Sequence, residues 1–78
     1  MVTMRLISNK NGIIRYSYRP ENQGEPGIIS YDKIYDVRTL EKLAENDREN
    51  SSFYRSQVYW FIYDNEDNPP LEGSRIWY

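Results

Sequence analysis

The chain contains no cysteine and no histidine among its 78 residues. Without cysteine no disulfide can staple a small fold, and the absence of both residue types removes the commonest zinc ligands. Histidine is also the usual general base, so nucleophilic catalysis of the Ser-His or Cys-His kind is excluded. A domain of this size has a thin core and often relies on a staple, a metal or a partner subunit. We therefore expect oligomerisation to support the fold.

A long apolar run and an excess of one charge are missing too. No segment has the apolar length of a signal peptide or of a membrane span, which predicts a cytoplasmic protein without membrane contact. Lys plus Arg number 10 and Asp plus Glu number 12, giving a net charge of −2. That balance disfavours a binder of duplex nucleic acid or of a membrane surface. The length supports a single domain over residues 1–78.

Aromatic side chains are what the chain has in quantity. They form 15% of the residues, and six of them lie in one stretch, Phe53 to Tyr63. As a helix, the stretch leaves Phe53, Trp60 and Tyr63 largely on the far side from a sheet. The face toward the sheet would then be Ser51, Tyr54, Val58, Phe61 and Ile62.

The residues alone do not decide between helix and strand for this stretch. Asn46 followed by Glu49 resembles a capping box and favours a helix that starts near Asp47. Aromatic and β-branched residues favour a strand, and the acidic run from Asp64 to Asp67 is unfavourable at the C-terminus of a helix. As a strand, both of its faces would be apolar, so either conformation leaves a surplus of aromatic surface.

The N-terminal part predicts a β-hairpin, because two β-rich runs, Val2 to Ser8 and Ile13 to Arg19, flank an Asn-Gly pair. A two-residue loop would mix charged and apolar side chains on both faces of the hairpin. A three-residue loop, Lys10 to Gly12, separates a core face from a solvated one, and we expect this loop. The core face is then Val2, Met4, Leu6, Ile14, Tyr16 and Tyr18. The other face is Thr3, Arg5, Ile7, Ile13, Arg15, Ser17 and Arg19.

Further elements follow the hairpin. The composition of Pro20 to Gly27 predicts a loop. The segment from Gly27 to Asp32 predicts a third strand, antiparallel to the second. Asp36 to Ala44 is ambiguous, although its apolar spacing favours a short helix over a strand. Asn68-Pro69-Pro70 must end the aromatic element. Ser74 to Tyr78 reads as a final strand whose end docks on the fold.

Four short motifs give the chain a resemblance to a family. They are Tyr16-Ser17-Tyr18-Arg19-Pro20-Glu21, Gly24-Glu25-Pro26-Gly27, Ala44-Glu45-Asn46-Asp47 and Ile76-Trp77-Tyr78. Together they resemble a group of uncharacterised proteins of about 80 residues from Gram-positive bacteria. This group has no established activity, so the resemblance carries over no functional residue. It implies a strand before Ala44 and a helix after Asp47, although the group has Ala and Lys where this chain has Val58, Tyr59 and Trp60.

The fold class predicted is α+β. We expect an antiparallel sheet of four to five strands, built on the N-terminal hairpin and packed against one long helix. The helix is placed over Asp47 to Asp64, on the resemblance together with the capping pattern. Residues 37–44 stay open between helix and strand.

No motif assigns a catalytic, cofactor-binding or metal-binding residue. The acidic run from Asp64 to Asn68 fails as a calcium loop, because Pro69 and Arg75 stand where glycine and glutamate are required. We expect a non-enzymatic protein-interaction or regulatory module, with a protein partner or a second copy bound at Phe53, Trp60 and Tyr63. One alternative is a binder of single-stranded nucleic acid that stacks bases on tyrosines, and another is a small enzyme that uses carboxylates and tyrosines.

Overall fold

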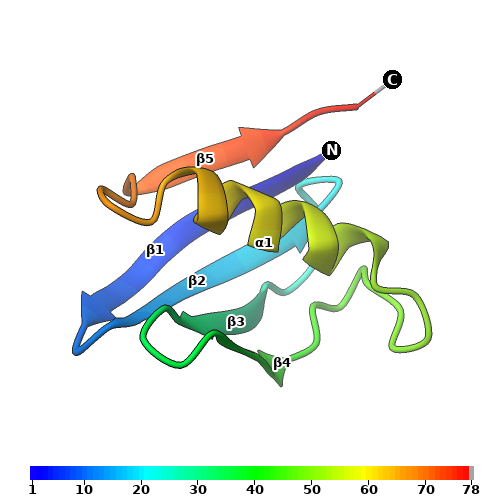
Figure 1. Cartoon of the computed structure of the whole chain (residues 1–78). Helices are drawn as coiled ribbons and strands as arrows, with labels where there is room; N and C mark the ends of the chain where they lie inside the picture. The colour runs from blue at the N-terminus through cyan, green and yellow to red at the C-terminus, as the bar shows by residue number, and fades with distance from the viewer. Residues whose placement is uncertain (78) are drawn as a thin grey trace.

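One helix lies across one face of a five-stranded antiparallel sheet in the computed structural model, which describes residues 1–77 (Figure 1). The elements in chain order are β1 (Val2–Lys10), β2 (Ile13–Pro20), β3 (Gly27–Asp32), β4 (Val37–Lys42), α1 (Phe53–Asp64) and β5 (Glu72–Arg75). The strands lie in the order β4-β3-β2-β1-β5. The α+β fold, with its sheet built on the N-terminal hairpin and covered by one helix, is therefore confirmed.

The turn of the β1–β2 hairpin differs from the prediction. Lys10 pairs with Ile13, so the loop has two residues and not three. Asn11 and Gly12 both have positive φ, at 56° and 78°. These are the left-handed conformations of a type I′ turn, whose twist matches that of the flanking strands and which asparagine and glycine tolerate best. The local turn chemistry thus decides the length of the loop.

A β-bulge then restores the predicted register. The pairing shifts between Leu6 and Ser8, which leaves Ile7 as an extra residue in β1. Beyond this bulge Met4 pairs with Tyr18, as a three-residue loop would also have required. An inserted residue of this kind changes the register without breaking the sheet. The predicted core face is confirmed, because its six residues are buried or half-buried: Val2, Met4, Leu6, Ile14, Tyr16 and Tyr18.

The core lies between the sheet and α1. Val58 and Ile62 of the helix are 0% and 1% exposed. They pack in one cluster with the apolar side chains of β1, β2 and β3. The helix contacts β1, β2, β3 and β5, whereas β4 lies beyond its edge (Figure 1).

Residues 37–44 are a strand for most of their length, so the local preference for a helix was wrong and the strand implied by the resemblance is confirmed. Val37 and Leu40 are 50% and 40% exposed, and only Ala44 of the apolar positions is fully buried. The apolar residues whose spacing favoured a helix are therefore left mostly in solvent, and only Leu43 and Ala44 are covered. Pairing with β3, in which Ile29 lies opposite Leu40, fixes the segment instead.

The helix ends at Asp64 as predicted but begins at Phe53, six residues after the expected start at Asp47. Asn46 and Glu49 lie in turns and do not cap a helix. Asp47 is directed into the protein, where its carboxylate accepts hydrogen bonds from Tyr18 and Arg55. The prediction of a capping box was therefore wrong: its two residues lie in turns, and Asp47 between them makes a long-range contact instead.

The final strand spans Glu72–Arg75 and not the predicted Ser74 to Tyr78. Ile76 is 57% exposed. Trp77 packs edge-on against Phe53, with ring centroids 5.0 Å apart, so this part of the chain does dock on α1. The last position of the predicted strand, residue 78, lies outside the described residues.

Glycine is required at the start of β3, where another segment passes very close. A Cβ on Gly27 would collide with the backbone nitrogen of Ala44, the carbonyl oxygen of Lys42 and the ring of Tyr18. Backbone atoms cannot move aside as the end of a flexible side chain can. The absence of a side chain at Gly27 therefore lets the segment after β4 reach the buried Tyr18.

We expect Gly27→Ala to destabilise the fold by about 3 kcal/mol, at the upper end of the usual cost of overpacking. Gly24→Ala is the matched control, because its Cβ would meet only the side chain of Glu45 and its cost should be about 1 kcal/mol for the left-handed φ of 78°. Urea denaturation followed by circular dichroism measures both. Equal losses for the two variants would contradict the close approach at Gly27.

Candidate functional site

The outer face of α1 carries two of the three residues predicted as an interface. Trp60 is 56% exposed and Phe53 is 48% exposed, while Val58 and Ile62 turn inward. The helical period of 3.6 residues separates these two sets, as expected for an amphipathic helix. Tyr63 is half-buried, yet both Trp60 and Tyr63 are more exposed than Val58 and Ile62, which confirms the predicted order of exposure.

Aromatic rings gather at the N-terminal end of α1. Phe53 contacts Tyr54 and Trp77, with ring centroids 5.9 and 5.0 Å apart. Tyr54 and Trp77 are 5.8 Å apart. The two contacts of Phe53 are edge-to-face, an arrangement that is favourable beyond the apolar area that it buries. Trp77 was absent from the predicted interface, although the apolar run at positions 76–78 had indicated that this segment docks.

A second group of rings lies at the C-terminal end of α1. Trp60 contacts Tyr63 with a centroid distance of 5.8 Å, and Tyr63 contacts Tyr31 of β3 at 5.1 Å. Tyr63 therefore connects the exposed Trp60 to the sheet. Phe53 belongs to the other group, so the three predicted residues share one side of the helix without forming one cluster. We call the surface formed by Phe53, Trp60, Tyr63 and Trp77 the aromatic face.

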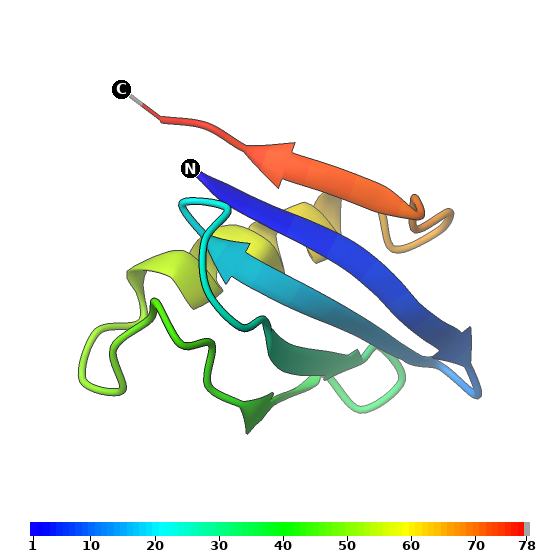
Figure 2. The ribbon, with the colours of Figure 1, turned by 180° about the vertical axis from the view of Figure 1, so that it is seen from behind.

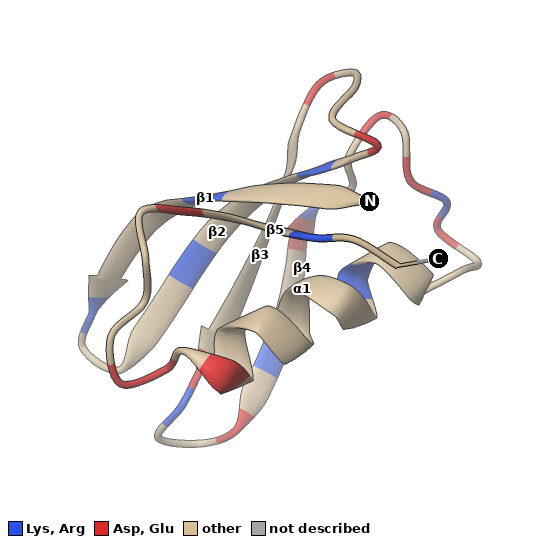
Figure 3. Ribbon diagram, turned by 90° about the horizontal axis from the view of Figure 1, so that it is seen from above, with Lys and Arg blue, Asp and Glu red and all other residues tan. Residues whose placement is uncertain are grey.

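The aromatic face has almost no charge. Arg55 and Asp64 are the only charged residues within Phe53–Asp64. Arg55 is buried, with its side chain 10% exposed. At the end of the helix Oδ2 of the exposed Asp64 lies 3.4 Å from Nη1 of Arg75, whose Nε donates to Gln57 Oε1 at 3.0 Å. Figure 3 accordingly draws the helix in tan apart from one basic and one acidic position. Depletion of charge together with aromatic enrichment is the composition of the centre of a protein interface.

A buried ion pair fixes α1 against the sheet. The Asp47 side chain is 1% exposed, and its Oδ2 accepts a hydrogen bond from the Tyr18 hydroxyl at 2.7 Å and one from Arg55 Nη1 at 3.3 Å. Tyr18 Oη in turn accepts the backbone N–H of Ala44 at 3.2 Å. Arg55 also donates to three carbonyl oxygens, those of Arg48, Glu49 and Ser51. This network joins β2, the segment before the helix and α1.

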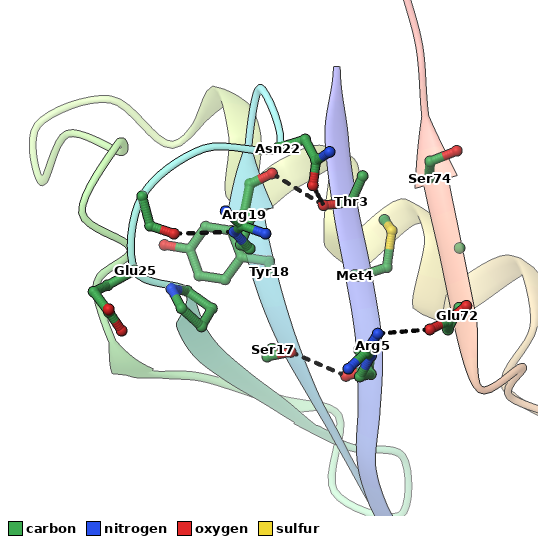
Figure 4. Close-up of a pocket in the computed structure, with 13 residues that line it drawn as sticks. Thr3, Met4, Arg5, Ser17, Tyr18, Arg19, Asn22, Glu25, Glu72 and Ser74 are labelled. Atoms are coloured by element: carbon green, nitrogen blue, oxygen red, sulfur yellow. Dashed lines mark hydrogen bonds and ion pairs between the residues drawn. The ribbon is translucent and has the colours of Figure 1, made fainter.

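The side of the sheet away from α1 is uncovered (Figure 2). It carries a polar hollow of about 760 Å³ between the loop after β2 and β5 (Figure 4). Arg5 Nη2 lies 2.8 Å from Glu72 Oε1, and Arg19 Nε donates to the carbonyl oxygen of Gly24 at 2.9 Å. Both guanidinium groups of the hollow thus bind groups of the protein itself, and the remaining polar side chains are neutral apart from Glu25.

The tyrosines proposed as a base-stacking platform face the core. Tyr16 and Tyr18 are 0% exposed and Tyr31 is 7% exposed, while the hairpin arginines lie on the opposite side of the sheet. The Tyr16 hydroxyl donates to the carbonyl oxygen of Pro70 at 2.6 Å. These rings are therefore covered by α1 and the loop that follows it.

Two carboxyl groups have shifted pKa values, and both shifts are downward. The hydrogen bond from Tyr54 lowers the pKa of Glu21, and the bidentate hydrogen bond from Arg15 lowers that of Glu41. A general acid at neutral pH needs the opposite shift. Within residues 1–77 no three or more Asp or Glu side chains are grouped closely enough to hold a metal ion. The described helix is neither long nor apolar enough to cross a membrane.

The stability of the fold should fall between pH 10 and pH 12. Burial raises the pKa of Tyr18 to about 12, and the hydrogen bond to Asp36 raises the pKa of Tyr31 to about 12. An unfolded tyrosine loses its proton near pH 10. Because the unfolded chain releases these protons first, the stabilisation is complete below pH 10 and is lost as the pH rises toward 12.

Urea midpoints measured at pH 8, 10 and 11.5 check this prediction. Tyr18→Phe should be less stable at pH 8, because Asp47 loses a hydrogen bond, and should show a shallower decline above pH 10. Tyr35→Phe, at a position 77% exposed, should retain the wild-type profile. A Tyr18→Phe profile parallel to wild type would contradict the role of Tyr18.

Comparison of the chain with models of protein families, with curated proteins and with solved structures found no match. The resemblance to small proteins of Gram-positive bacteria therefore stays a prediction.

Proposed function

We propose that the protein is a non-enzymatic interaction module that associates with a second copy of itself through the aromatic face of α1. The observation that carries the proposal is the exposure of Trp60 and Phe53 on a helix face whose charged groups, Asp64 and Arg75, are paired with each other, in a chain of which 28% is charged. A surface helix normally directs charged residues to solvent. Exposed aromatic residues in such a setting are typical of interface centres.

The pattern of the face suits a second copy, because it is complementary to itself. Phe53 and Trp60 lie seven residues apart, about 10.5 Å along the helix axis at 1.5 Å per residue. A two-fold axis near Ser56 and Gln57 sets Phe53 of each copy beside Trp60 of the other, with a small residue between the rings. Contacts of this reciprocal kind define isologous dimers. The charged groups nearest this axis, Arg75 and Asp64, are paired within each copy, so the face carries no net charge.

A dimer also agrees with the size of the chain. Seventy-eight residues without cysteine or histidine form a thin core. Burying Trp60 and Phe53 between two copies adds apolar burial that one copy lacks. Nucleic-acid binding has less support, because the candidate stacking rings are buried. Carboxylate catalysis has less support, because the shifted carboxyl groups are held in the charged form.

Trp60→Ala should weaken the dimer by about 30-fold in Kd, the effect of losing an interface residue worth about 2 kcal/mol. Phe53→Ala should weaken it less, since Trp77 already covers part of this ring. Sedimentation equilibrium over a range of concentrations measures the change. Leu71→Ala is the control, because Leu71 is 75% exposed but lies outside the helix, and it should leave Kd unchanged.

Two results would count against the proposal. One is a wild-type chain that sediments as a monomer at millimolar concentration. The other is a dimer that Leu71→Ala weakens as much as Trp60→Ala does, because this would place the contact on another surface. Circular dichroism of each variant distinguishes loss of the dimer from loss of the fold, and substitutions at exposed positions are expected to leave the fold intact.

A further inference from the structure

β4 ends the sheet on the side opposite β5, and in the described chain no strand lies beyond it. All six of its residues, Val37–Lys42, are exposed. The strand contains neither proline nor glycine, and α1 does not cover it. A free edge of this kind offers unpaired backbone groups to another strand.

The hydrogen-bonding pattern of the sheet shows which backbone N–H and C=O groups of β4 point away from β3. Lys33 N donates to Gly12 O at 2.9 Å, which continues the ladder between β3 and β2. Backbone groups of consecutive residues in an antiparallel ladder turn to opposite edges. Counting from this bond through the β3–β4 register, Thr39 turns its N–H and C=O inward to β3. Arg38 and Leu40 therefore turn theirs outward, along the free edge.

Exposed apolar side chains are concentrated beside this edge. Tyr35, Val37 and Leu40 are 77%, 50% and 40% exposed. Ile34 is exposed too but lies over Gly12 of the β1–β2 turn, so three of the ten exposed large hydrophobic residues of the described chain fall within six consecutive positions beside the edge. Single exposed apolar residues are ordinary, but a concentration beside a free strand edge indicates a contact surface.

The charge along the edge is positive. Arg15 binds Glu41 through two hydrogen bonds of 2.9 and 2.8 Å, which neutralises the only acidic residue of β4. Arg38 and Lys42 have no carboxylate within ion-pair distance among residues 1–77. The free edge thus presents two cations, although the chain as a whole has a net charge of −2.

We propose that β4 binds an extended segment of a different protein, which adds to the sheet as a sixth strand. The backbone groups of Arg38 and Leu40 supply the hydrogen bonds, as in other cases of strand addition. The segment carries an acidic side chain opposite Arg38 and an apolar one opposite Leu40. The edge lies apart from the aromatic face, so the proposal is independent of self-association through α1.

A second copy of β4 suits this edge less well than an acidic segment does. A symmetric antiparallel pair centred on Leu40 runs through the irregularity at Glu41, where the β3–β4 register shifts by one residue, and it brings Arg38 of each copy near Lys42 of the other. A bulge disrupts pairing, and like charges that face each other destabilise it. A pair centred on Thr39 sets Arg38 opposite Leu40 and leaves the cation without a partner. The positive edge therefore favours a partner segment that carries carboxylates.

The probe is a blocked five-residue peptide, Gln-Leu-Thr-Glu-Val, written to lie antiparallel to β4. It places leucine opposite Leu40, threonine opposite Thr39 and its glutamate opposite Arg38, with an uncharged glutamine opposite Glu41. Titration of the isotope-labelled full chain, followed by amide NMR, should shift the amide signals of Arg38 and Leu40 most. Those two amides should also exchange more slowly with solvent once peptide is bound.

Variants define the site. Arg38→Glu should raise the Kd for the peptide about tenfold, because it replaces attraction with repulsion at one position. Lys10→Glu is the matched control, since it makes the same kind of charge change at an exposed residue of β1, and it should alter Kd less than about twofold.

Leu40→Pro should abolish binding, because proline removes an N–H donor that points outward from the edge, and an edge strand tolerates proline. A peptide with lysine in place of the glutamate should bind at least tenfold more weakly to the wild-type chain, because it sets a cation opposite Arg38.

Three results would overturn the proposal. The first is a saturating peptide that leaves the β4 amides unshifted, or that shifts those of α1 instead. The second is an Arg38→Glu variant that binds the peptide as tightly as wild type does. The third is protection of the Arg38 and Leu40 amides that grows with protein concentration in the absence of peptide, because this would make the occupant a second copy.

Discussion

The carboxylate of Asp47 is the group on which the arrangement of this fold depends. It is 1% exposed and is held between the hydroxyl of Tyr18 and the guanidinium of Arg55. A buried charge is costly unless it is paired and hydrogen-bonded, and removing one partner of such a pair typically costs 3–5 kcal/mol. Tyr18 comes from β2 and Arg55 from α1, so one carboxylate determines how the helix sits on the sheet and where the preceding segment enters it.

The same network shapes the surface of the helix. Arg55 is the only cation of α1, and it points inward to Asp47 and to three carbonyl oxygens. The outer side of the helix therefore carries no cation of α1, and the cation that reaches Gln57 between Phe53 and Trp60 is Arg75 of β5. Satisfaction of a buried carboxylate and the absence of an α1 cation from the aromatic face are two results of one side-chain orientation.

The features predictable from the sequence were those decided by local pattern. Alternation of apolar residues in β1 and β2 gave the correct core face, and helical spacing gave the correct order of exposure for Trp60 and Val58. Features decided by distant contacts were missed or left open: the start of α1, the strand at residues 37–44 and the contact of Trp77 with Phe53. The β1–β2 hairpin shows a local and a distant influence together. The turn residues set a two-residue loop, whereas packing of the core set the pairing of Met4 with Tyr18. The bulge at Ile7 makes the two compatible. The free edge of β4 could not be predicted, because it depends on which strands pair.

The position of β5 beside β1 has a consequence for how the chain folds. Strands β1 to β4 pair with their neighbours in sequence, whereas the Arg5–Glu72 contact joins residues 67 positions apart. Local pairs form early, and pairs that close a long loop are delayed by the entropy of closure. During synthesis β1 to β4 can therefore form a four-stranded meander before α1 covers its apolar face. The last strand then completes the sheet on the other side of β1, only after α1 has been made.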